Sequence, residues 1–91
     1  MQETTTIRIQ NLKGLHARAT AAFVKVAENF EAQISVEKEG EIPVSGKSIM
    51  GLLMLAVPLG EEIKITADGN DSKEAIKALV DLINNKFGEE I

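Results

Sequence analysis

The residues of this 91-residue chain that could carry chemistry gather around one histidine. His16 is the only histidine, and Arg18 follows it by two positions. The pair lies between an alternating stretch over 5–9, which is typical of a strand, and apolar residues at helical spacing over 19–30. A lone histidine at such a junction has three interpretations: a surface residue, a residue that caps the helix, or a nucleophile at the helix's positive end.

Other functions of histidine, such as metal binding and hydrolysis, need partner residues that this chain lacks. A metal site draws on several His, Cys or carboxylate ligands, whereas this chain has one His, no Cys and no carboxylate at ligand spacing near it. A Ser-His-Asp hydrolase is not indicated, because no nucleophile-elbow motif accompanies His16. We therefore expect no metal and no cofactor.

The position just before a helix suits His16 to phosphoryl transfer. The positive end of the helix dipole disfavours a cationic imidazolium, and so favours a neutral, nucleophilic ring. The free backbone N–H groups near Ala17 and Arg18 would stabilise an anion added to that ring. The Arg18 guanidinium can donate further hydrogen bonds to phosphoryl oxygens. This stretch therefore meets the requirement for a reversible phosphoryl relay.

Four stretches alternate with period two, as strands with one buried face do. They cover residues 5–9, 32–38, 42–44 and 61–67. In the third, Ile42 and Val44 flank Pro43, which cannot donate a ladder hydrogen bond, so we expect an edge strand there. One apolar and one polar face on every strand predicts an antiparallel sheet that is covered on one side.

Three stretches are predicted to be helices, over about 17–29, about 48–53 and from Asp71 to near Phe87. The last begins with a capping-box signature, in which Asp71 is the N-cap and Glu74 its partner. The order strand, helix, strand, strand, helix, strand, helix predicts an α+β fold with the helices on the apolar face of the sheet. The length favours a single domain over residues 1–91.

The middle helix is apolar on nearly every side. If Leu52 and Leu55 face the sheet, then three other apolar residues of the helix stay exposed: Ile49, Met50 and Leu53. Either a following loop covers them, or they form a surface that docks other proteins. Ser48 at the head of this helix is a candidate N-cap, and also a candidate phosphorylation site whose charge would disturb an apolar interface.

Composition narrows the class of partner. A net charge of −4, with no Trp or Tyr and three Phe, argues against nucleic acid. No signal peptide is recognisable, and the longest apolar run, 52–57, is far too short to cross a bilayer. We expect a cytoplasmic protein without membrane insertion, whose partner is another protein or a small anion.

Two separated stretches resemble a known family. Residues 11–19 (NLKGLHARA) and 46–51 (GKSIMG) are similar to motifs of the HPr-type phosphocarriers of the bacterial phosphoenolpyruvate-dependent phosphotransferase system, including its nitrogen-related branch, NPr. The resemblance covers essentially the whole chain. It implies an open-faced β-sandwich, in which four antiparallel strands in the order 1-4-2-3 lie under three helices.

The resemblance also implies a function and its residues. Nδ1 of His16 would accept a phosphoryl group from enzyme I and pass it to an enzyme IIA, while Arg18 steadies the group. Ser48 would correspond to the serine that HPr kinase/phosphorylase modifies in some relatives. The docking patch shared by the partners would be Ile49, Met50 and Leu53. The chain would then be a monomeric carrier and not an enzyme.

One departure from the family pattern lies beside the site, and two other functions stay open. Ala19 stands where the family commonly has proline; proline suits a first helical turn but is not required there, so we expect transfer to survive. The alternative is a regulatory protein-binding module of the same family, acting through Ser48 and the 48–54 helix, with transfer secondary. A small-molecule-binding regulatory domain is a third, for which the sequence shows no pocket signature.

Overall fold

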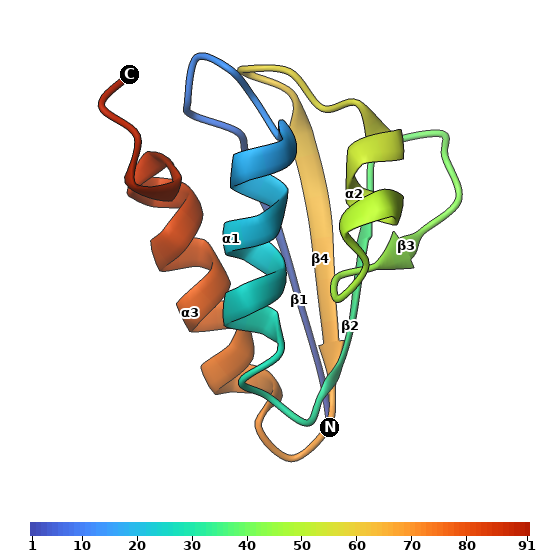
Figure 1. The fold of residues 1–91 in the computed structure, drawn as a ribbon. Coiled ribbons are helices and arrows are strands. Elements are labelled where there is room, and N and C mark those ends of the chain that lie inside the picture. The colour runs from blue at the N-terminus through green and yellow to red at the C-terminus, as the bar shows by residue number, and fades with distance from the viewer.

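The predicted strands form one sheet in the computed structural model, which describes residues 1–91 (Figure 1). The strands are β1 (Gln2–Arg8), β2 (Gln33–Glu37), β3 (Val44–Ser45) and β4 (Glu62–Asp68). The helices are α1 (Ala17–Ala27), α2 (Ile49–Leu55) and α3 (Ser72–Asn84), followed by a short 3-10 helix, η1 (Lys86–Gly88). This βαββαβα order confirms the predicted α+β class.

The sheet has the order β1-β4-β2-β3, and every neighbouring pair is antiparallel. Its register aligns Ile7 with Ile63, Ile34 with Ala67 and Val36 with Ile65. Apolar side chains of adjacent strands therefore share one face, as the period-two pattern predicts. The implied order 1-4-2-3 is confirmed.

All three helices lie on that apolar face, with α1 between α2 and α3 (Figure 1). Helix α1 buries Ala19, Phe23 and Ala27 completely. Helix α3 buries Ala75, Leu79 and Ile83 on the stripe that its spacing predicts. The opposite face of the sheet is uncovered, so the sandwich is open-faced.

The third strand is shorter than its sequence pattern predicts. Strand β3 spans only Val44 and Ser45 at the sheet edge, and the 84% exposed Ile42 lies in the preceding loop. The prediction that Ile42 shares a strand face with Val44 is therefore wrong, whereas the edge position is confirmed. Pro43 lies immediately before the strand, where its missing N–H costs no ladder hydrogen bond.

The start of α3 lacks the predicted capping box. Asp71 occupies the N-cap position, but its side chain forms no cap hydrogen bond. Its two carboxylate oxygens instead accept from the backbone N–H groups of Glu31 and Ala32, each at 2.9 Å. These hydrogen bonds lower the pKa of Asp71, the one from Glu31 most strongly. Asp71 thus ties the start of α3 to the chain that enters β2.

The chain turns sharply after α3, which ends earlier than the apolar spacing predicts. Helix α3 ends at Asn84, and Lys86 and Phe87 then adopt left-handed backbone angles, with φ of +55° and +56°. Non-glycine residues in this conformation cost on the order of 1–2 kcal/mol each. The 9% exposed Phe87 side chain packs in the core and anchors the turn. The turn directs residues 89–91 toward the start of α1.

Candidate functional site

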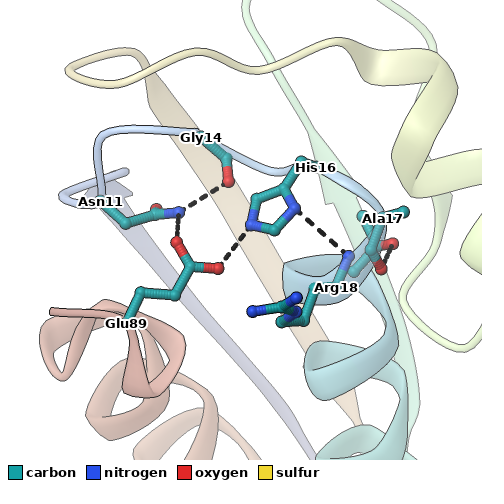
Figure 2. Close-up of polar contacts among 7 residues, drawn as sticks. Asn11, Gly14, His16, Ala17, Arg18 and Glu89 are labelled. Atoms are coloured by element: carbon teal, nitrogen blue, oxygen red, sulfur yellow. Dashed lines mark hydrogen bonds and ion pairs between the residues drawn. The ribbon is translucent and has the colours of Figure 1, made fainter. Parts of the chain in front are cut away.

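His16 is the N-cap residue of α1. Its backbone is extended, with φ −81° and ψ −176°, and its carbonyl accepts the first helical hydrogen bond from Thr20 N–H at 2.8 Å. The ring Nδ1 accepts from the backbone N–H of Arg18 at 3.3 Å (Figure 2). The predicted junction is thus confirmed, and the imidazole performs the capping that a Ser or Asp side chain usually provides.

The other ring nitrogen is also engaged. Nε2 of His16 contacts Oε2 of Glu89, and Oε1 of the same carboxylate accepts from Asn11 Nδ2 at 2.9 Å (Figure 2). Asn11 is fully buried, and its Nδ2 also donates to the carbonyl of Gly14 at 2.8 Å. One amide group therefore holds both the loop before His16 and the carboxylate beside it.

The Glu89 carboxylate is ionised at neutral pH. Burial raises the pKa of Glu89, but hydrogen bonds from Asn11 and His16, together with the positive charges of His16 and Lys13, outweigh this effect. The net result is a pKa below the ordinary value of 4.5. An ionised carboxylate only accepts hydrogen bonds, so the contact with Glu89 requires a proton on Nε2 of His16.

The loop that carries His16 rests against the segment that follows α2. Gly14 has a φ of +68°, and a Cβ at this position would lie 2.5 Å from the carbonyl oxygen of Val57. The N–H of Leu15 donates to that same oxygen at 2.9 Å. Close backbone approach and left-handed geometry therefore both require glycine here. The contact places the end of α2 directly beside the residues that position His16.

The Arg18 side chain is exposed and forms no hydrogen bond or ion pair with the chain. It therefore remains available to an anion that arrives from outside. Ala17 is the first helical residue, and its N–H has no intrahelical acceptor. The structure thus brings together the sequence-predicted ring, guanidinium and backbone donors at one helix start, with 26% of the His16 side chain accessible.

Ser48 caps α2 as the sequence predicts, since its Oγ accepts from Gly51 N–H at 3.0 Å. Leu52 and Leu55 are buried, whereas Ile49 and Met50 are 44% and 67% exposed. Leu53 is only half-buried, so the expectation that it is largely exposed is wrong. Met54 was not predicted in this set, yet it is 74% exposed. The exposed apolar residues of α2 are therefore Ile49, Met50 and Met54.

The hollows of the surface lie elsewhere. Both are lined mainly by polar side chains of the uncovered sheet face and its edges, and neither includes His16, Arg18 or Ser48. His16 thus sits on an open surface and not in a substrate pocket. Any molecule that reacts with His16 must therefore approach across this open surface.

Sequence reasoning missed Glu89 and gave Asn11 no role. Glu89 lies 73 positions from His16, so no periodicity or short motif connects them. Asn11 does belong to the family-like stretch 11–19, and its position three residues before Gly14 is the one available signal. Such a spacing is typical of a side chain that closes a turn on the backbone.

Comparison with known proteins agrees with this geometry. The family model described as "PTS HPr component phosphorylation site" matches residues 3–85. The phosphocarrier protein HPr of Neisseria meningitidis is 49% identical over 84 residues, which cover 92% of this chain and 93% of that protein. The HPr of Cupriavidus necator is 45% identical over 89 residues, covering 98% and 97%.

The solved structures give the same result. The crystal structure of HPr-C-His from Thermoanaerobacter tengcongensis superposes with a TM-score of 0.93 at 53% identity, covering 98% of this chain and 99% of that chain. The chain belongs to the HPr family of phosphocarrier proteins. It is thus a phosphocarrier of the bacterial phosphotransferase system, which carries a phosphoryl group and is not itself an enzyme. None of its helices has the length and apolar character needed to span a bilayer.

Proposed function

We propose that this protein accepts a phosphoryl group on Nδ1 of His16 from phosphorylated enzyme I and passes it to an enzyme IIA. The observation that supports this most is the position of the ring. The lone pair of Nδ1 points toward the backbone N–H of Arg18 at the start of α1, while the exposed Arg18 guanidinium has no partner within the chain.

The transfer step uses groups that are already in place. The Nδ1 lone pair attacks phosphorus, and the bond from phosphorus to the donor atom of enzyme I breaks with its electron pair returning to that donor atom. The Arg18 N–H must release Nδ1 first, and at 3.3 Å this hydrogen bond is near the long limit and costs little to break. The same N–H, that of Ala17 and the Arg18 guanidinium then stabilise the phosphoryl oxygens.

Phosphoryl transfer to His16 and away from it would both require little rearrangement, which suits a carrier. A phosphoryl group held by backbone dipoles and one exposed arginine is stabilised but not enclosed, so an acceptor side chain on an enzyme IIA can approach it in line. The exposed apolar residues of α2 would provide the docking surface for both partners. Of the implied docking residues, Ile49 and Met50 have this exposure, whereas Leu53 would contribute from the edge of the patch.

The experiment is phosphorylation with phosphoenolpyruvate and enzyme I. An acid-labile, base-stable phosphate indicates a phosphate bound to nitrogen, and because the chain has one histidine, a phosphohistidine can only be at His16. Phosphorus NMR should show the Nδ1 isomer. His16→Ala should abolish labelling while Lys25→Ala, on the exposed face of the same helix, retains it. A base-labile phosphate, the Nε2 isomer, or labelling that survives His16→Ala contradicts the proposal.

The second candidate is a regulatory module that acts through Ser48. The observation in its favour is the Ser48 Oγ, which caps α2 directly beside the exposed Ile49 and Met50. A phosphate from HPr kinase/phosphorylase there would place a dianion against the docking surface. Under this alternative Ser48→Asp changes partner binding and His16→Ala does not. In both cases the protein would act as a cytoplasmic monomer.

A further inference from the structure

The transfer step described above leaves the second ring nitrogen of His16 without a role. Nε2 is nevertheless held by the Glu89 carboxylate, whose other oxygen is bonded by Asn11. Nδ1 meanwhile faces the Arg18 backbone N–H, which can only donate. The ring therefore lies between a pure acceptor and a pure donor, as Figure 2 shows. Only the tautomer with its proton on Nε2 satisfies both neighbours.

We infer that Glu89 is a positioning residue that keeps His16 in the Nε2–H tautomer, so that the Nδ1 lone pair can attack phosphorus; this inference rests on the proposed function. In the opposite tautomer Nδ1 bears the proton and cannot act as a nucleophile. Its N–H would also point at the N–H of Arg18. The partner of one ring nitrogen thus decides the chemistry available at the other.

Glu89 also stabilises the product of the transfer. When the bond from Nδ1 to phosphorus forms, the proton stays on Nε2 and the ring acquires positive charge. The Glu89 carboxylate faces that charge directly through its hydrogen bond. An acidic residue that orients a histidine and stabilises its cationic form has the same physical role in serine hydrolases.

The fold fixes Glu89 from both sides along the chain. Phe87 is anchored in the core before it, and the carbonyl of Ile91 accepts from Leu12 N–H at 3.1 Å after it. The Glu89 side chain is only 14% exposed. Its contact with His16 is therefore held by buried and backbone interactions, and does not depend on a chance surface pairing.

The orientation of Asn11 is fixed as well. Its Nδ2 donates to two acceptors, the Gly14 carbonyl and the Glu89 carboxylate. A flipped amide would place Oδ1 against both of these oxygens, which is repulsive, so the drawn orientation is the stable one even though Oδ1 itself has no partner. Asn11 thus acts as the buried group that sets the direction of the Glu89 carboxylate.

Glu89→Gln tests the inference because it keeps the shape and reverses the polarity. In the variant, Asn11 continues to donate to the carbonyl oxygen of the introduced glutamine side chain. The NH₂ group of that glutamine then faces Nε2 of His16 and requires a lone pair on it. The ring proton should move to Nδ1. The nitrogen-15 chemical shifts of the resting protein at pH 8 report this directly: we expect the Nε2–H pattern in the wild type and a shift to Nδ1–H in the variant.

The matched control is Glu90→Gln, which removes the same charge from the neighbouring exposed residue. Rapid-quench transfer from phosphorylated enzyme I should slow by on the order of tenfold or more in Glu89→Gln and change less than about twofold in Glu90→Gln. Glu89→Ala, with water at Nε2, should give a mixture of tautomers and an intermediate rate. Circular dichroism confirms that each variant is folded.

Two results would overturn the inference: the Nε2–H tautomer persisting in Glu89→Gln, or a tautomer shift with no loss of rate. Failure of the proposed function is distinguishable from both. In that case enzyme I does not phosphorylate the wild type at all, whereas the ring tautomers of the wild type and the variant still show whether Glu89 controls them.

Discussion

His16 combines reactivity with access at the scale of a single residue. Its ring is held at both nitrogens, yet about a quarter of its side chain is exposed. A more deeply buried ring would be oriented equally well but could not meet a reacting group on another protein. A freely exposed ring would have to lose its rotational entropy each time that it is aligned for transfer. The N-cap position avoids both losses, because the backbone fixes the ring while one side stays open.

Arg18 should contribute to transfer without contributing to the fold, because its guanidinium is exposed and unpaired within the chain. Arg18→Ala removes a charged donor from the phosphoryl group as it moves. We expect its transfer rate from phosphorylated enzyme I to fall by on the order of tenfold to a hundredfold, with an unchanged unfolding midpoint. Lys25→Ala on the same helix removes equal charge, and rapid-quench rates within twofold of each other for the two variants would refute this role.

The Glu89 contact should make stability depend on pH. Its pKa in the folded state is lowered below the ordinary value of 4.5, because the hydrogen bonds from Asn11 and His16 exceed the opposing effect of burial. The carboxylate therefore stabilises the fold fully above pH 4.5, and this contribution is lost as the pH falls through the lowered value. In urea unfolding, the free energy of unfolding of the wild type should exceed that of Glu89→Gln most at neutral pH, and this difference should shrink toward pH 3.

That pH dependence has its own control in the same segment. The free energy of unfolding of Glu90→Gln should follow that of the wild type at every pH, since Glu90 is exposed and forms no ion pair. A constant gap between the wild type and Glu89→Gln at all pH values would mean that the carboxylate charge contributes nothing to the folded state.

The loop before α1 is the element that sets where His16 stands. Gly14 brings this loop into backbone contact with the segment after α2, and its φ is +68°. Gly14→Ala adds left-handed strain and a Cβ 2.5 Å from the Val57 carbonyl oxygen. We expect a loss of roughly 2–4 kcal/mol in the free energy of unfolding, together with slower transfer because His16 moves.

Gly40→Ala separates these two effects. Gly40 has a φ of +82°, but no atom lies within 4 Å of a Cβ built there. Its substitution should cost only the backbone strain of about 1–2 kcal/mol and leave transfer unaffected. If denaturant unfolding gave equal losses in the free energy of unfolding for Gly14→Ala and Gly40→Ala, the close backbone approach at Gly14 would not be the reason that glycine is required there.

The elements whose shape depends on local periodicity were predictable from the sequence. The alternation of β4 and the apolar stripes of α1 and α3 reflect burial on one face, and the structure confirms them. Ser48 was recognisable as a cap because its bond to Gly51 is local. His16 and Arg18 were recognisable because they share one short stretch.

The remaining features depend on contacts between distant parts of the chain. Asp71 has the sequence of a capping residue, but the backbone of Glu31 and Ala32 lies within reach and competes successfully for its carboxylate. Strand β3 is short because its partner β2 ends at Glu37, so that in their register Ile42 lies beyond the end of β2. Glu89 reaches His16 only because the chain turns at Lys86 and Phe87, a conformation that neither residue type favours.

At the scale of the whole molecule, the loop that positions His16 is joined to the segment that follows the exposed helix α2. Val57, which follows α2, accepts the Leu15 N–H immediately before His16. Under the proposed function, a partner that docks on α2 would thereby come close to the ring. Because no pocket surrounds His16, the proposed docking on α2 would supply the binding energy for transfer, so docking and chemistry should be separable by substitution.

Met50→Glu tests that separation. Met50 is 67% exposed, so a charge there should leave the fold intact but place a solvated carboxylate against an apolar partner. We expect KM for phosphorylated enzyme I to rise by on the order of tenfold, with kcat changed less than about twofold. Gln33→Glu adds the same charge to the uncovered face of the sheet, on exposed Gln33 of β2, and should leave both constants unchanged. Equal effects of the two variants would indicate long-range charge repulsion, whereas a fall in kcat alone would show that α2 acts on the chemistry and does not dock the partner.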